Sequence, residues 1–252
     1  MKHFTKTFIA INLFFIVACA GPTATLKNPQ PPFEWKTANA TPGATLQHKE
    51  IERRDDIGEV KYKFFAQGVP SDKDYEFWMR WIDGTAGKTS VTIRLKESGE
   101  LVGYIKDKEA NLIITLHDIR ESEPVYYALV SRDTAIRAFD TIIPFPVQAR
   151  SAEGCQLELK LITPDGMNFS IIAKGFEPNE EVTTRSTSNG EVIEGLAQAS
   201  SSDGVFIAII NPGVVGKRGG TAAYTAVGRS CQVTLNYRWG QAMRLGGMKS
   251  EK

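Results

Sequence analysis

Three cysteines and three histidines are the residues of this 252-residue chain best suited to metal binding or covalent catalysis. Past the first twenty residues the histidines are His48 and His117, and neither has a histidine or cysteine at metal-ligand spacing. His117 precedes Asp118 and could form a catalytic dyad, but a histidine beside an acid is far commoner as a surface feature. Asp72 and Asp74 lack the remaining ligands of a calcium loop. The sequence therefore predicts no metal and no cofactor.

Motifs for nucleophilic catalysis and phosphate binding fail on detail. No G-x-S-x-G is present, and Ser230 opens a strand-like run that leaves no place for a nucleophile elbow. The stretch GVVGKRGG (213–220) superficially resembles a phosphate loop, but Arg218 stands at its Ser/Thr position and Asn211 where its first glycine belongs. We interpret it as a glycine-rich hairpin loop that offers Lys217 and Arg218 as a contact surface. We expect a protein that is not an enzyme.

Aromatic side chains suggest a second kind of surface. Trp78 falls on the otherwise polar face of its strand, and strand alternation cannot bury both Tyr126 and Tyr127 on one face. Exposed aromatics of this kind bind glycans, so we name these three as a possible binding surface. The alternative is that they lie under the other domain.

The first residues have the form of a bacterial export signal. Lys2 and Lys6 precede an apolar run from Phe8 to Ala20, which is too short to span a bilayer. The residues IVAC (16–19) resemble the bacterial lipobox, which implies that residues 1–18 are removed and Cys19 is acylated. Ala20 in place of aspartate then implies the outer membrane of a Gram-negative cell, facing the periplasm or the surface. The alternative is cleavage after Ala20, which would discard Cys19 and release a soluble exported protein.

The other two cysteines fall in phase with apolar residues of two strand-like runs. Cys155 begins CQLELKL and Cys231 begins CQVTLNYRW, so both thiols point into a core. An even pair in an exported chain favours a disulfide, and two separate buried thiols are the alternative. With Lys2 and Lys6 removed the mature chain is close to neutral, which gives no reason to expect nucleic acid as a partner.

Period-two alternation dominates the rest of the chain and predicts an all-β protein of two tandem antiparallel β-sandwich domains. The one short helical candidate is residues 131–140. We expect Phe33 and Trp35, at the end of a proline-rich tether, to pack back on the first domain. The predicted parts are a lipoprotein signal peptide (1–18), the lipidated cysteine and tether (19–43), an N-terminal sandwich (44–148), an immunoglobulin-like sandwich (149–240) and a polar tail (241–252). In the C-terminal domain the expected strands are 155–163, 167–175, 180–187, 191–199, 204–210, 220–227 and 230–239.

The two halves also echo each other. FFAQGVPSDKDY (64–75) aligns with IIAKGFEPNEEV (171–182), which suggests two related domains. Within the second copy, GFEPNEEV resembles the G-F-x-P-G-E-x-V opening of immunoglobulin-like modules in bacterial surface and secreted proteins, with Asn179 in place of a glycine. That resemblance implies a fold and an extracytoplasmic location, but no shared activity.

Together these features predict a membrane-anchored envelope lipoprotein that acts by binding and scaffolding. Its expected partners are a membrane, through the lipid, and envelope proteins, as in a secretion-system assembly. The alternative is a carbohydrate-binding or adhesive module directed at peptidoglycan or host glycan.

Overall fold

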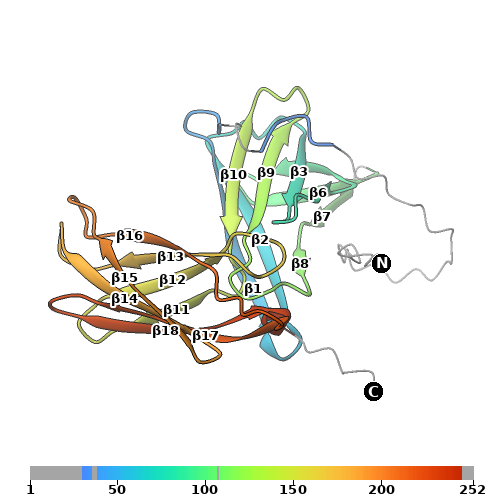
Figure 1. Ribbon diagram of the computed structural model, residues 1–252. Helices are drawn as coiled ribbons and strands as arrows, with labels where there is room; N and C mark the ends of the chain where they lie inside the picture. Colours follow the sequence, from blue (N-terminus) through green and yellow to red (C-terminus); the bar gives the residue numbers. More distant parts are fainter. Residues whose placement is uncertain (1–29, 36–38, 107, 246–252) are drawn as a thin grey trace, which may run out of the picture. The chain divides into compact units, whose positions relative to one another are not determined.

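The computed structural model describes residues 30–35, 39–106 and 108–245, so Cys19 and the signal region lie outside the described residues (Figure 1). The described chain is all-β, apart from two short 3₁₀ turns, and every strand pairing is antiparallel. In this part of the chain no helix has the length and apolar character needed to cross a membrane. The predicted fold class is confirmed.

Two compact units divide the chain. The first runs to Ile142 but omits residues 119–124, which belong with residues 143 onward in the second unit. The sequence placed a single boundary between residues 148 and 149. Ser122 accounts for part of the difference, because its N–H donates to the Phe145 carbonyl at 2.8 Å and its carbonyl accepts from the Leu161 N–H at 2.9 Å.

The first unit contains two sheets. Its elements are β1 (Thr45–Arg54), the 3₁₀ turn η1 (Asp55–Ile57), β2 (Glu59–Gln67), β3 (Tyr75–Arg80), β4 (Ala86–Lys88), β5 (Thr92–Leu95), β6 (Leu101–Ile105), β7 (Lys108–Asn111), β8 (Ile114–Leu116), β9 (Val125–Ser131) and β10 (Arg137–Ile142). One sheet has the order β1-β2-β8, and the other has the order β10-β9-β3-β5-β6-β7 with β4 also on β3. The segment 131–140, our helical candidate, is instead the end of β9, a turn and most of β10.

Aromatic rings join the two sheets of the first unit. On β2 the alternating residues Val60, Tyr62, Phe64 and Ala66 are buried, as the period-two pattern requires. The Phe64 ring lies 4.7 Å from the ring of Phe77 on β3 and 4.7 Å from that of Tyr127 on β9. The first unit is therefore a sandwich with an aromatic core.

The second unit is a sandwich of two four-stranded sheets. Its elements are β11 (Val147–Arg150), β12 (Gln156–Leu161), β13 (Phe169–Lys174), β14 (Glu181–Ser188), β15 (Glu191–Gln198), β16 (Phe206–Ile210), β17 (Gly219–Val227), β18 (Gln232–Gly240) and the 3₁₀ turn η2 (Gln241–Met243). The sheet orders are β11-β12-β13-β16 and β15-β14-β17-β18. All seven strands expected between residues 155 and 239 are present. Met243, in the predicted polar tail, is buried.

The two units share one strand order. The set β1-β2-β8 corresponds to β12-β13-β16, and β10-β9-β3-β4 corresponds to β18-β17-β14-β15. In each unit the chain leaves the second strand of the set, turns at a glycine and enters the opposite sheet. This common plan is the immunoglobulin-like arrangement predicted for the second half. The first unit adds β5, β6 and β7 to it.

Candidate functional site

Cys155 and Cys231 form the predicted disulfide, with their Cα atoms 6.2 Å apart and a sequence separation of 76. Cys155 directly precedes β12 and Cys231 directly precedes β18, so the bridge links the two sheets of the second unit. Closing a loop of this length contributes about 4 kcal/mol to stability in the chain-entropy model. The bridge is a structural element and gives no reactive thiol.

The aromatic binding surface predicted around Trp78 is wrong. Trp78 is 1% exposed because Phe33 packs on it, with ring centroids 6.3 Å apart, and Trp35 packs on Phe33. The expected return of Phe33 and Trp35 to the first domain is thus confirmed, and it covers the surface that alternation left open.

The two adjacent tyrosines face opposite sides of β9, as alternation requires. Tyr127 is fully buried among Phe64 and Phe77, which rules it out as a contact residue. Tyr126 is half-buried, with the Arg80 guanidinium 5.9 Å from its ring centroid. Of the three aromatics, only Tyr126 keeps an accessible surface.

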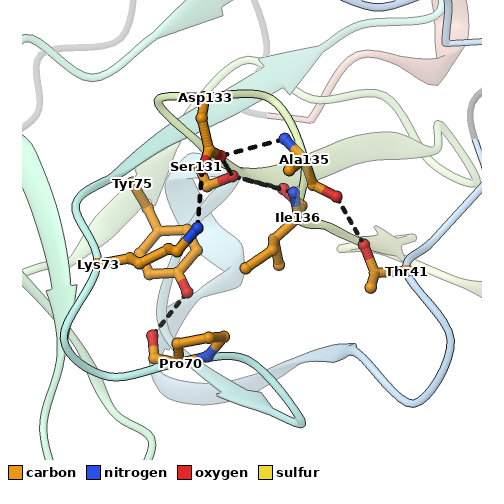
Figure 2. A network of polar contacts seen from close by, with 8 residues as sticks. All are labelled: Thr41, Pro70, Lys73, Tyr75, Ser131, Asp133, Ala135 and Ile136. Atoms are coloured by element: carbon orange, nitrogen blue, oxygen red, sulfur yellow. Dashed lines mark hydrogen bonds and ion pairs between the residues drawn. The ribbon is translucent and has the colours of Figure 1, made fainter.

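A polar network closes the turn between β9 and β10 (Figure 2). The Asp133 carboxylate accepts hydrogen bonds from the Ser131 hydroxyl and from the Ala135 N–H at 3.2 Å, and pairs with Lys73 Nζ at 2.8 Å. These donors lower the pKa of Asp133, the Lys73 hydrogen bond most of all. The Ile136 N–H also donates to the Ser131 hydroxyl, at 3.0 Å. These hydrogen bonds hold the chain in a turn between β9 and β10, in place of the helix expected for residues 131–140.

The two histidines that the structure describes each lie beside a carboxylate. His117 Nδ1 lies 3.2 Å from a carboxylate oxygen of Glu59, a residue distant in sequence, and no contact is recorded between His117 and Asp118. His48 Nδ1 lies 2.6 Å from Asp140 on β10. The described residues hold no group of three His, Cys, Asp or Glu side chains placed to bind a metal ion.

The second unit has an open depression of about 490 Å³ with mainly polar walls. Its lining includes Glu121, Asn189, Asn236 and Arg238. Arg238 donates to both carboxylate oxygens of Glu121, at 3.0 and 2.6 Å, and this hydrogen bonding raises the pKa of the guanidinium. Since the ion pair satisfies both charges, the depression offers neutral hydrogen-bonding groups to a ligand.

Lys217 and Arg218 are exposed, as expected, on the loop between β16 and β17. The loop is held by its backbone: the Lys217 N–H donates to the Val214 carbonyl at 3.0 Å, and the Arg218 carbonyl accepts from the Gln241 N–H at 2.9 Å. Both cations are available to an acidic partner.

A group of exposed apolar side chains on two neighbouring strands was not predicted. It lies on β15 and β16, which are the end strands of their two sheets and lie next to each other (Figure 1). We call this group the open edge; its members are Val192 (48% exposed), Ile193 (66%), Leu196 (68%), Ile207 (64%) and Ile209 (67%). Strand alternation places Val192 and Leu196 on the outer face of β15, Ile193 on its inner face, and Ile207 and Ile209 on the outer face of β16. On the opposite side of the unit, β11 and β18 lie against each other.

The sequence contains a pattern that corresponds to part of the open edge, but polar/apolar alternation does not apply to it. FIAII (206–210) is apolar at every position, a pattern typical of a strand buried on both faces. Phe206 is indeed buried, but Ile207 and Ile209 face outward, where no element of the described chain covers them. A fully apolar run indicates that both faces of the strand favour burial. It does not indicate whether the same chain or another molecule buries them.

Comparison with known proteins adds little to this geometry. No family model and no curated protein matches the sequence. Among solved structures, the chain matches the tetra-tandem repeat in the extending region of a large adhesion protein, with 10% sequence identity and a TM-score of 0.27. The match covers 78% of this chain and 49% of that one, so the chain spans about half the length of that structure. The description of the fold therefore stands on the strand order given above.

Proposed function

We propose that this chain is an envelope lipoprotein that works by binding and scaffolding, without catalysis of its own. Cys19 holds it on a membrane, and the open edge makes its protein contacts. The setting we propose is an accessory role in a multi-protein assembly of the outer membrane, such as a secretion system.

The open edge is the observation that carries this proposal. Ile193, Leu196, Ile207 and Ile209 are each about two-thirds exposed, although isoleucine and leucine are among the residues most often buried. Neighbouring apolar side chains on a soluble surface mark interaction sites, because covering them removes apolar area from water. The rigid sandwich beneath them supports a partner without the entropy loss of ordering a loop.

Glycan binding is supported less well. The carbohydrate alternative rested on Trp78, Tyr126 and Tyr127 as exposed rings, and two of these are buried in the first unit. The depression of the second unit retains hydrogen-bonding groups, but an apolar edge is suited to protein contacts.

Site-specific photo-crosslinking in cells that express the full chain tests the proposal. A photoreactive amino acid at Leu196 should give a discrete protein adduct, whereas the same group at Thr234, exposed on another strand of the same sheet, should give none. Adding Val192→Lys, on the same face of β15 as Leu196, should remove the adduct and leave the melting temperature unchanged, since an exposed substitution shifts stability by no more than about 0.5 kcal/mol. Equal labelling at Leu196 and Thr234, or binding to peptidoglycan that survives Val192→Lys, would contradict it.

A further inference from the structure

β16 is an end strand with one unused side. It pairs with β13 from Phe206 to Ile210, and no strand of the described chain pairs with its other side. A free strand edge presents a row of unpaired N–H and C=O groups that can accept another strand.

The hydrogen bonds of Val205 show which residues face that free side. Its N–H donates to the Ser200 hydroxyl at 3.3 Å, and its carbonyl accepts from the Ser200 N–H at 2.8 Å, so neither group points toward β13. Backbone groups alternate in direction along an antiparallel strand. Ile207 and Ile209 therefore direct their N–H and C=O groups to the free side, while Phe206, Ala208 and Ile210 bond to β13.

The free edge of β16 lacks the usual protection against pairing. Natural end strands carry charges, prolines or bulges that keep other strands away. β15 follows this rule with Glu191 and Glu194, whereas Phe206 to Ile210 contains no charged residue and no proline. Of the two strands that form the open edge, β16 is thus the one suited to strand addition.

The strand is also complementary to itself. In an antiparallel pairing about a two-fold axis at Ala208, Ile207 of each copy lies opposite Ile209 of the other. The outward backbone groups of these residues then meet as hydrogen-bonded pairs, and Ala208 meets its own counterpart as a non-hydrogen-bonded pair. Apolar side chains face apolar side chains on both faces of the joined sheet, and no like charges oppose each other. A two-fold contact of this type closes on itself and ends at a dimer.

We propose that β16 pairs with β16 of a second copy of this chain in this register, so that two β11-β12-β13-β16 sheets become one continuous sheet. The inference rests on the proposed function, since it names a partner of the open edge. It also makes Ile207 of each copy a cross-strand neighbour of Ile209 of the other, on the outer face of the joined sheet.

Cysteine crosslinking in the full chain tests the pairing. Non-hydrogen-bonded antiparallel neighbours have Cα atoms about 4.5 Å apart, within disulfide range, so Ala208→Cys should give a covalent dimer on a non-reducing gel. Leu196→Cys, on β15, is the matched control and should remain monomeric. The parent chain, run alongside, accounts for any dimer formed through Cys19.

Paired charge substitutions on the Ala208→Cys background test the register. In Ile207→Lys/Ile209→Lys, like charges lie opposite each other across the axis, and the dimer should fall about tenfold. In Ile207→Lys/Ile209→Glu, each lysine lies opposite a glutamate of the other copy, and the dimer should persist. Melting temperatures of the two variants establish that both are folded.

The outcomes separate this inference from the function on which it rests. No Ala208→Cys dimer, a dimer equally strong with Leu196→Cys, or an equal response of the two charge variants would overturn the β16 pairing. If a Leu196 photo-adduct to another envelope protein persists in that case, the binding function stands and only the self-pairing falls. Absence of both the dimer and the adduct would remove both proposals.

Discussion

At the scale of single residues, alternation predicts which face of the strand a side chain takes. It does not predict which other residues pack over that side chain. Tyr126 and Tyr127 take opposite faces as the sequence requires, and Tyr127 lies in the core between the sheets. Trp78 takes the face predicted for it, yet Phe33 covers that face from a segment more than forty residues earlier. No local pattern carries such a contact, which is why the predicted aromatic site failed while the phase of each strand was correct.

Burial of Tyr127 predicts that the stability of the fold decreases at alkaline pH. Burial raises the pKa of Tyr127 well above its usual value, and burial raises the pKa of Tyr62 to about 12. In the unfolded chain tyrosine ionises near pH 10, so the stability held by these protonated hydroxyls is complete below pH 10 and is lost as pH rises toward 12.

Tyr127→Phe should therefore flatten the loss of melting temperature between pH 9 and pH 11. The Tyr127 hydroxyl is buried without a hydrogen-bond partner, so its removal should also stabilise the protein at pH 7, by about 1 kcal/mol. Thermal melts of Tyr127→Phe and of the half-buried control Tyr126→Phe, each across the pH series, measure both effects. A lower melting temperature for Tyr127→Phe at pH 7 would show that the hydroxyl has a bonding partner in solution.

At the scale of elements, the internal echo in the sequence identifies the same turn in both units. Gly68 follows β2 and Gly175 follows β13, and both have positive φ, 68° and 82°. A Cβ on Gly68 would lie 2.0 Å from the Gly43 carbonyl oxygen, and one on Gly175 would lie 2.8 Å from that of Gly154. Gly43 and Gly154 each stand two residues before the first strand of the shared plan, so the corresponding glycines meet the same part of the fold.

Gly175→Ala should consequently lower the free energy of unfolding by more than the strain of a left-handed backbone alone would. Its Cβ meets backbone, which cannot move aside as a side chain can, and we expect a loss of about 3 kcal/mol. Gly190→Ala is the matched control, with positive φ but no atom within 4 Å of its Cβ, and should cost about 1 kcal/mol. Urea denaturation of the two variants measures the difference, and equal losses would mean that the close approach relaxes.

Residues 119–124 show why the boundary between the two units could not be predicted from local sequence patterns. Cys155 and Cys231 could be paired from strand phase and export alone, because both signals are local. Residues 119–124 join the second unit through Ser122, whose backbone partners are 23 and 39 positions away. In the first unit, Thr41 makes a comparable long-range contact with β10: its N–H donates to the Arg137 carbonyl at 2.8 Å, and its hydroxyl accepts the Arg137 N–H at 2.9 Å.

At the scale of the whole molecule, the acylation of Cys19 that we propose would determine whether the open edge acts at a membrane. Each buried CH₂ of an acyl chain contributes about 0.8 kcal/mol, so several chains on one cysteine would give nearly irreversible attachment. Palmitate fed to cells should label the wild-type protein, and Cys19→Ser should be unlabelled and recovered in the soluble fraction. Cys155→Ser should keep the label, since that thiol belongs to the disulfide. An unlabelled wild-type protein would instead mean cleavage after Ala20: the β16 edge would keep its partner, but a membrane-held scaffold would no longer be tenable.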